Sequence, residues 1–116
     1  MSRPVGPYTP SVRAGRWVVC SGQIGLEEGV LVAGGVVAQA RRALENVGGL
    51  LAQKGLSWAD VVKTTVYLAA IDDYAVFNEV YADVLGEHRP ARSVVAVAGL
   101  PLGALVEVEA WAYTAG

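Results

Sequence analysis

The chain has 116 residues, a length that suits one domain over residues 1–116 and is too short for two. Nine basic and eleven acidic residues give a formal net charge of −2, and no stretch concentrates Lys and Arg. This balance argues against a nucleic-acid backbone as the main partner. One cysteine and one histidine rule out an internal disulfide and argue against a structural zinc site.

Residues 1–10 contain no apolar core of a signal peptide. No apolar run approaches the roughly 18 residues that a membrane-spanning helix needs. We therefore expect a cytoplasmic protein with no membrane partner. Hydrophobic residues make up 53% of the chain, above the roughly 45–50% of an ordinary soluble domain. The simplest place for this excess is an interface between subunits.

The first half of the chain predicts two strands followed by a long helix. The strands are expected over 11–13 and 16–24 around an Ala14-Gly15 turn, with Ser21-Gly22 ending or bending the second. A loop over 27–35 carries a short strand at 30–32. Apolar residues at helical spacing then predict a helix over 36–54, which Gly48-Gly49 weakens and Gly55 ends.

The second half predicts a helical turn at 57–60, a strand at 61–68 and a helix from residue 72 or 73 to Leu85. The expected apolar stripe of this helix is Tyr74, Phe77, Tyr81 and Val84. Strands at 93–98 and 105–113 complete the chain, with a turn between them. The pattern predicts an α+β domain.

Two helices can cover only one face of such a sheet, so its other face should be polar. The last strand instead has Val106, Val108, Ala110 and Ala112 on one side, and Leu105, Glu107, Glu109, Trp111 and Tyr113 on the other. In the strand at 61–68, Val62, Val66 and Leu68 are expected opposite Val61, Lys63 and Tyr67. A sheet face this apolar, with few charges, is typical of a subunit interface that also holds functional groups.

Two charged residues are unusual for their surroundings. Arg92 opens an otherwise apolar strand, where its guanidinium must find an anion or reach solvent. It suits a carboxylate ligand, but a structural ion pair or a surface position explains it equally well. Glu107 lies within an apolar strand as a candidate general base, or as an interface carboxylate. Glu109 shares its face, and we expect a structural ion pair there.

The remaining polar candidates have ordinary structural explanations. Tyr8 suits turn packing, Ser21 has no base near it in sequence, and Asn78 is expected to be a satisfied polar group on a helix. Cys20 is expected to be a small buried residue of a strand, and His88 to be solvated. The chain has no nucleotide-binding fingerprint or Ser/His/Asp order.

Several segments together resemble the RidA/YjgF family. They are Gly6-Pro7-Tyr8, Ser21-Gly22-Gln23-Ile24, Ala38-Gln39, Leu44-Glu45-Asn46, Val62-Lys63-Thr64-Thr65-Val66, Phe77-Asn78-Glu79-Val80-Tyr81, Pro90-Ala91-Arg92-Ser93 and Val106-Glu107-Val108-Glu109-Ala110. The resemblance implies a chorismate-mutase-like subunit, with a mixed, mostly antiparallel sheet and two helices on one face. It also implies a homotrimer with sites between subunits.

The resemblance further implies hydrolysis of reactive enamines and imines, such as 2-aminoacrylate and 2-iminopropionate, to 2-oxo acids and ammonia without a cofactor. Arg92 matches the arginine that holds the substrate carboxylate, and Glu107 the glutamate that positions or activates water. The other expected pocket residues are Tyr8, which closes over the substrate, Ser21, Gly22, Asn78 and Val94.

Three features depart from the common family pattern. Val94 stands where many members carry cysteine, Pro10 where glutamine is common, and the loop over 25–29 is short. If position 94 contributes its backbone carbonyl, valine preserves the role. The alternatives to a deaminase are a non-catalytic or regulatory carboxylate-binding protein of a sister branch, and an endoribonuclease.

Overall fold

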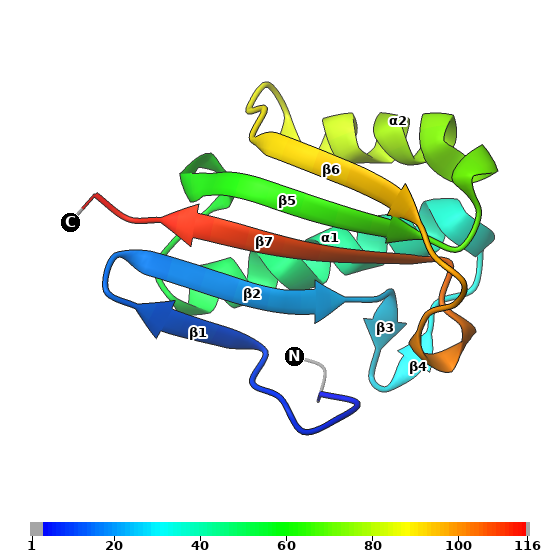
Figure 1. Ribbon diagram of the computed structural model, residues 1–116, viewed down its shortest axis with the longest axis horizontal. Helices are drawn as coiled ribbons and strands as arrows, with labels where there is room; N and C mark the ends of the chain where they lie inside the picture. Colours follow the sequence, from blue (N-terminus) through cyan, green and yellow to red (C-terminus); the bar gives the residue numbers. More distant parts are fainter. Residues whose placement is uncertain (1–3, 116) are drawn as a thin grey trace.

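A five-stranded sheet forms the centre of the computed structural model, which describes residues 4–115 (Figure 1). Its strands lie in the order β1-β2-β7-β5-β6, and all neighbours are antiparallel except the parallel pair β5–β6. The bounds are β1 (Ser11–Ala14), β2 (Trp17–Gln23), β5 (Val61–Leu68), β6 (Ala91–Ala96) and β7 (Val106–Tyr113). The predicted α+β class with a mixed, mostly antiparallel sheet is confirmed.

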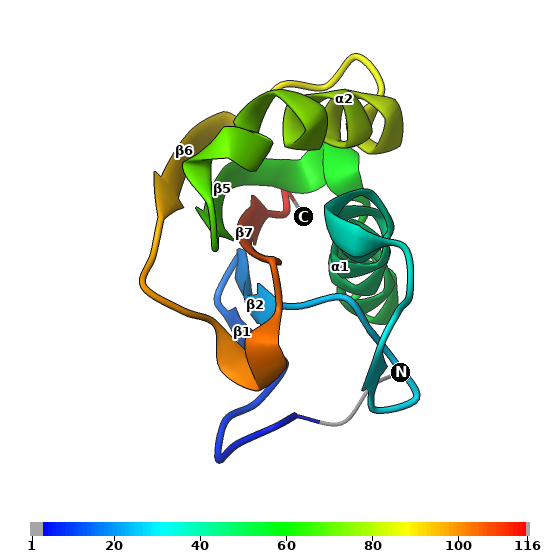
Figure 2. The ribbon, with the colours of Figure 1, turned by 90° about the vertical axis from the view of Figure 1, so that its right-hand side faces the viewer.

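Both long helices, α1 (Gly35–Gln53) and α2 (Tyr74–Leu85), cover the same face of this sheet (Figure 2). Their apolar residues pack on alternate residues of the strands, as a period of two in strands and 3.6 in helices requires. Fully buried members include Val18, Leu44, Val47, Leu51, Val66, Phe77, Val106 and Val108. The Gly48-Gly49 pair does not interrupt α1. Gly48 lies close to the Trp58 indole, since a Cβ there would stand 3.3 Å from its Nε1.

Five short elements complete the fold. Strands β3 (Leu26–Glu27) and β4 (Val30–Leu31) form a small hairpin at one end of the sheet, within the predicted loop. The 3₁₀ turns are η1 (Trp58–Asp60), η2 (Ile71–Asp73) and η3 (Pro101–Gly103). Turn η1 has the predicted capping pattern, because Ser57 and Asp60 cap each other's backbone.

The start of β5 corrects one predicted face. Val61 is 2% exposed and Val62 is 46% exposed, although Val62 was expected to share a face with Val66. The register of β5 against β7 shifts between Val61 and Lys63, and such a bulge reverses the alternation beyond it. Val61 therefore joins the core, and Val62 faces outward.

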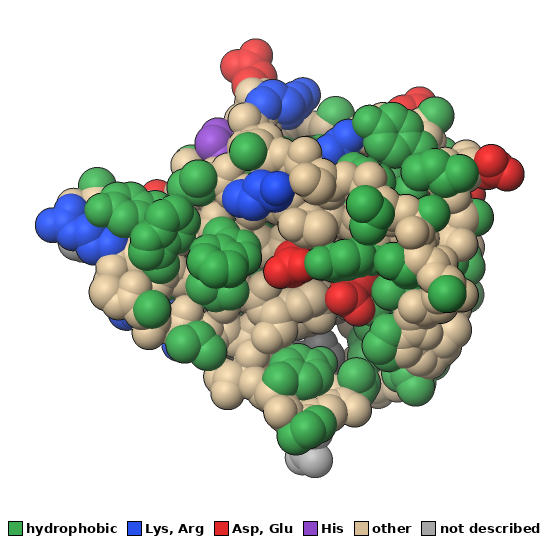
Figure 3. Space-filling model, viewed as in Figure 1, with side chains coloured by type: hydrophobic (Ala, Val, Ile, Leu, Met, Phe, Trp, Pro, Cys, Tyr) green, Lys and Arg blue, Asp and Glu red, His purple; other side chains and the backbone are tan. Residues whose placement is uncertain are grey.

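The sheet face away from the helices carries many large apolar side chains (Figure 3). Trp17 packs edge-on against Trp111 and Tyr113, with ring centroids 6.1 and 5.0 Å away, and all three are substantially exposed. Acidic side chains lie near the middle of this face, beside a hollow (Figure 3). The predicted alternation along β7 is confirmed, since Val106, Val108, Ala110 and Ala112 are buried. None of the described helices has the length and hydropathy of a membrane span.

One side chain of the predicted α2 stripe is misplaced. Phe77, Tyr81 and the partly buried Val84 face the core, but Tyr74 is 43% exposed. Tyr74 stands at the first position of the helix, beyond the edge of the core. Its phenol instead contacts Arg92 of the neighbouring strand.

Candidate functional site

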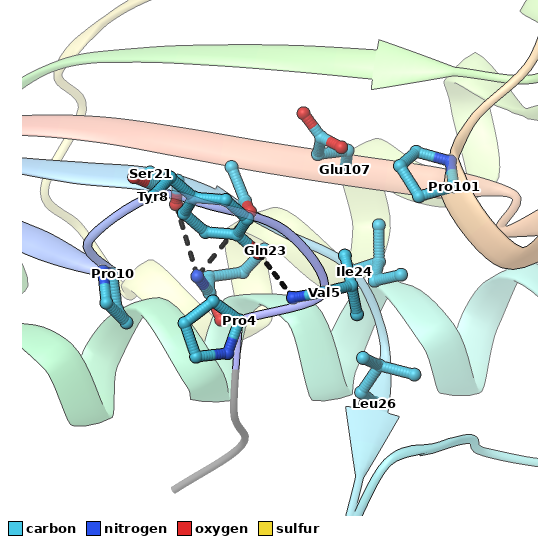
Figure 4. Close-up of a pocket in the computed structure, with 11 residues that line it drawn as sticks. Pro4, Val5, Tyr8, Pro10, Ser21, Gln23, Ile24, Leu26, Pro101 and Glu107 are labelled. Carbon is cyan, nitrogen blue, oxygen red and sulfur yellow. Dashed lines mark hydrogen bonds between the residues drawn. The ribbon is translucent and has the colours of Figure 1, made fainter.

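A pocket of about 210 Å³ opens on the helix-free side, at the end of β2 (Figure 4). The N-terminal segment forms one wall, the end of β2 and its continuation to β3 a second, and η3 with β7 a third. The lining residues are Pro4, Val5, Tyr8, Pro10, Ser21, Gly22, Gln23, Ile24, Leu26, Pro101 and Glu107. Four of the predicted site residues, Tyr8, Ser21, Gly22 and Glu107, are thus brought together.

Ser21 holds the N-terminal wall in place. Its backbone N–H donates to the Pro10 carbonyl at 2.8 Å, and its Oγ donates to the Thr9 carbonyl at 2.7 Å. Tyr8 is 40% exposed, and its hydroxyl accepts a hydrogen bond from the Val5 N–H at 3.2 Å. The Ser21 hydroxyl proton is therefore used for structure, which supports the expectation that Ser21 is no nucleophile.

The backbone at Gly22 leaves the space that the Glu107 carboxylate fills. A Cβ on Gly22 would lie 2.3 Å from Glu107 Oε2 and 2.6 Å from its Cδ. The register of β2 against β7 shifts between Cys20 and Gln23, so Ser21-Gly22 form an irregularity where the sequence predicted an end or bend. Glycine at this irregularity lets a carboxylate of β7 lie against bare backbone.

The surroundings of Glu107 favour its protonated form. Burial raises its pKa, and the negative charge of Glu109 on the same face adds to the rise. Among residues 4–115 the Glu107 carboxylate has no hydrogen-bond partner, so its oxygens are free to contact water or a ligand. A partly buried carboxylate with a raised pKa suits proton exchange nearer to neutral pH.

Glu109 differs from the prediction. We expected an ion pair, but its carboxylate accepts a hydrogen bond from the Tyr67 hydroxyl, and no cation pairs with it in the described part of the chain. This bond is the main reason that the pKa of Tyr67 rises to about 12. The nearby Lys63 donates instead to Ser93 Oγ at 3.0 Å.

Arg92 forms a second cluster, at the far edge of the sheet. Its guanidinium carbon lies 4.8 Å from the centroid of the Tyr81 ring and 5.6 Å from that of Tyr74, and its Nη2 donates to Tyr74 Oη at 3.2 Å. Within residues 4–115 no carboxylate pairs with Arg92, so a structural ion pair does not explain it. The guanidinium remains free to bind an anion in a shallow pocket lined by Asn78, Tyr81, Ala82, Arg89, Pro90 and Arg92.

Asn78 also departs from the prediction of a satisfied polar group. Its Oδ1 is buried and has no hydrogen-bond partner in the described chain. Burying such an oxygen costs free energy unless a ligand or water donates a hydrogen bond to it. Val94 lies on edge strand β6, two residues after Arg92, with its side chain packed against the core. In the described structure β6 is the last strand on this side of the sheet, so the backbone of Val94 lies at the sheet edge.

The two clusters lie on opposite faces of the sheet. Arg92 is paired with the buried Thr64, on the helix side, whereas Glu107 is paired with Tyr67 on the open side. Val95, the other partner of Tyr67, lies three residues after Arg92, which is about 10 Å along the strand. Two strand spacings add about 10 Å across the sheet. One chain therefore does not bring Arg92 and Glu107 to the same ligand.

Two amide residues of α1, which the sequence pattern did not single out, also support the site. Gln39 is 8% exposed, and its Oε1 accepts from the Leu105 N–H at 2.8 Å, two residues before Glu107. Asn46 donates from Nδ2 to the carbonyls of Ile24 and Leu26 at 3.2 and 3.0 Å. These contacts join the helix to two walls of the pocket. Polar residues beside the apolar stripe of a helix were the available signal.

Cys20, His88 and Gly25 lie outside the two clusters and have structural surroundings. Cys20 is fully buried, as expected, and burial raises the pKa of its thiol to about 11. His88 is not simply solvated: its Nε2 lies 2.8 Å from the Val61 carbonyl, and the ring is half-buried. Gly25 allows α1 to approach, because a Cβ there would lie 2.7 Å from the Gln39 Cα.

Comparison with known proteins places this arrangement in a family. Residues 1–114 match the family described as endoribonuclease L-PSP. A RutC family protein of Pyrococcus horikoshii is 43% identical over 113 residues, covering 96% of this chain and 90% of that protein. The human 2-iminobutanoate/2-iminopropanoate deaminase is 44% identical over 108 residues, covering 91% of this chain and 79% of the relative.

Solved structures agree with the sequence match. The Escherichia coli protein TdcF, crystallised with bound serine, superimposes with a TM-score of 0.90 at 39% identity, covering 97% of this chain and 91% of that chain. A match over nearly the whole chain at this identity shows common descent and not fold alone. The chain therefore belongs to the endoribonuclease L-PSP family, which is the RidA/YjgF family that the sequence motifs indicated.

Proposed function

We propose that this protein hydrolyses reactive 2-imino acids, and their enamine tautomers such as 2-aminoacrylate, to 2-oxo acids and ammonia. The observation that carries the proposal is the Glu107 carboxylate, which lies over Gly22 in a pocket, with a raised pKa and no hydrogen bond to residues 4–115. The deaminase name of relatives at 44% identity supports the same reaction.

The reaction balances with water as the only co-substrate. Glu107 accepts a proton from water while the water oxygen bonds to the carbon of the imine in its N-protonated form, which gives a neutral carbinolamine. The proton then moves to the amino nitrogen, the C–N bond breaks and ammonia leaves, and the remaining hydroxyl proton is lost as the carbonyl forms. An imine carbon is already electrophilic, so a positioned water and a moderate base suffice.

Arg92 would hold the substrate carboxylate. It is a guanidinium that no carboxylate in the described part of the chain pairs with, it contacts two tyrosine rings, and its two-pronged geometry matches a carboxylate. Serine, which is bound in the TdcF structure, carries the same α-carboxylate as a 2-imino acid. The exposed edge strand at Val94 would add a backbone contact, and Asn78 Oδ1 an acceptor for the substrate's nitrogen.

Because Arg92 and Glu107 lie on opposite faces of one sheet, a complete site needs two copies of the chain. The exposed apolar face with Trp17, Trp111 and Tyr113 offers the surface on which such copies would pack. We propose a homotrimer in which one subunit supplies Arg92 and its neighbour supplies the Glu107 pocket with Tyr8. In a closed ring of three, every subunit contributes to two sites.

A coupled assay tests the function. A pyridoxal-phosphate lyase that releases 2-aminoacrylate from serine or chloroalanine is run with and without this protein, and 2-oxo-acid formation is followed. We expect acceleration by the wild type and by Glu45→Gln, a carboxylate change on the helix side of the sheet, and a large loss in Glu107→Gln. If the wild-type protein leaves the spontaneous rate unchanged while pyruvate still binds it in calorimetry, it is a carboxylate-binding protein instead.

An endoribonuclease is the second candidate, because the matching family carries that description. The net charge of −2 and the absence of a basic run argue against it. Incubation with a labelled single-stranded RNA at low and moderate salt decides between them. Cleavage that survives in Glu107→Gln would support a ribonuclease site elsewhere on the chain.

A further inference from the structure

Strand β7 places two carboxylates, Glu107 and Glu109, side by side on the open face, about 7 Å apart along the strand. Two carboxylates this close interact electrostatically, so the charge on one affects the protonation of the other. The structure gives them different partners. The Tyr67 hydroxyl donates to Glu109, whereas Glu107 faces Gly22 without a donor among residues 4–115.

Tyr67 is placed to make this distinction. In the register it stands directly opposite Glu107, and its side chain reaches diagonally to Glu109, whose own partner on β5 is Thr65. Diagonal cross-strand neighbours are within reach of an aromatic side chain. The Tyr67 hydroxyl therefore holds the Glu109 carboxylate, and Glu107 is the carboxylate of the pair that meets no donor among residues 4–115.

We propose that Tyr67 and Glu109 are positioning residues for the deaminase reaction: the Tyr67 hydroxyl holds the Glu109 carboxylate in place, and Glu109 in turn acts on proton exchange at Glu107. The proposal rests on the proposed function for its catalytic meaning, though not for its electrostatics. Atoms balance as described above, since Glu107 alone takes and returns the proton and Glu109 changes no bond.

The other groups around Glu107 do not compete for this role. From β5, Lys63 is turned to Ser93, and from the N-terminal segment Tyr8 is hydrogen-bonded to Val5. The end of β2 contributes Ser21, Gly22 and Gln23, none of them charged. Burial and the charge of Glu109 are the two causes that raise the pKa of Glu107. Both the geometry and the electrostatics therefore make Glu109 the charged neighbour that acts on Glu107.

The test is a pH titration of the Glu107 side-chain carboxyl by carbon-13 NMR in the intact protein, assigned by its loss in Glu107→Gln. Glu109→Gln should lower the Glu107 midpoint by about half a unit to one unit, because a negative charge about 7 Å away is removed. Glu109→Asp keeps the charge and should stay close to the wild type. Tyr67→Phe should also shift the Glu107 midpoint, because the Glu109 carboxylate is then no longer held by the hydroxyl.

The same variants are measured in the coupled assay. The acid limb of kcat/KM should move with the Glu107 midpoint in Glu109→Gln, and KM should change little. An unmoved midpoint in both Glu109→Gln and Tyr67→Phe would overturn the proposal and leave the Tyr67–Glu109 bond a structural cross-strand contact. If Glu109→Gln does not fold, Tyr67→Phe still decides. If the wild type has no deaminase activity, the proposed function fails, while the titration still tests this inference without substrate.

Discussion

The Glu107 carboxylate rests against the bare backbone of Gly22, where a Cβ would stand 2.3 Å from Oε2. The atom displaced by such a Cβ is the end of a flexible side chain, so the fold tolerates the change while the carboxylate moves. We expect Gly22→Ala to lower kcat/KM by roughly tenfold to a hundredfold, because small displacements of a reacting group are costly. Its melting temperature should change by only a few degrees.

Gly49→Ala is the matched control for this substitution. A Cβ on Gly49 meets nothing within 4 Å, and the residue lies on the exposed side of α1. It should keep full activity and raise stability by up to about 1 kcal/mol. Equal activity of Gly22→Ala and the wild type would show that the position of Glu107 does not limit the reaction.

Arg92→Lys should retain the fold and weaken binding of pyruvate or 2-oxobutyrate by roughly tenfold to a hundredfold, measured by calorimetry. A lysine has no planar fork and makes a poorer contact with the tyrosine rings, and hydrogen bonds to charged groups are worth about 1.5–3 kcal/mol. Arg92→Ala should bind more weakly still. Arg41→Lys, at an exposed ion pair with Asp83, is the control and should bind as the wild type does. Normal binding by Arg92→Ala would place the carboxylate site elsewhere.

Glu107→Gln should lower kcat by roughly 10²–10⁴-fold, the usual range for loss of a general base, and leave pyruvate binding nearly unchanged. It should also alter the pH dependence of stability. The folded protein raises the pKa of Glu107, so between the ordinary value of 4.5 and the raised one the folded state holds more protons than the unfolded state. Stability is therefore lost as pH rises through this window.

The glutamine variant lacks that loss. Its free energy of unfolding, measured with urea at pH 4 and pH 7, should increase relative to that of the wild type as pH rises. A variant with low activity and unchanged pH dependence of stability would mean that Glu107 is not electrostatically strained in the folded protein.

Subunit mixing tests the divided site. Arg92→Ala and Glu107→Gln are each expected to be inactive, but a mixed ring contains one site with both native residues. Random mixing of equal amounts after denaturation and refolding should restore about a quarter of the wild-type activity in a three-subunit ring. Light scattering supplies the subunit number. Complete absence of activity in mixed rings would show that the two residues do not share a site.

Cys20→Ala should keep its deaminase activity, because the thiol is fully buried and its pKa is raised to about 11. A buried thiol with a raised pKa is a poor nucleophile at neutral pH. Removing the sulfur should cost roughly 1 kcal/mol of stability through lost packing, seen in urea unfolding. Native protein should also resist a thiol reagent at pH 8. A folded but inactive Cys20→Ala would indicate thiol chemistry.

The sequence by itself determined the local elements and most of the two sheet faces. Alternation along β7, the helical stripe of α1 and the glycines that end helices are properties of neighbouring residues, so the pattern shows them directly. It also selected Arg92 and Glu107, because a charge in an apolar strand is unusual wherever the strand lies.

Only the tertiary structure decided which groups meet. Three features depend on register and on packing between segments far apart in the chain: the bulge that buries Val61 instead of Val62, the Tyr67–Glu109 bond, and the lack of a donor to Asn78 Oδ1 among the described residues. Register placed Arg92 and Glu107 on opposite faces, and strand order set them two strands apart. No periodicity of residues along the chain encodes that separation, because it arises from how five strands are ordered and aligned in space.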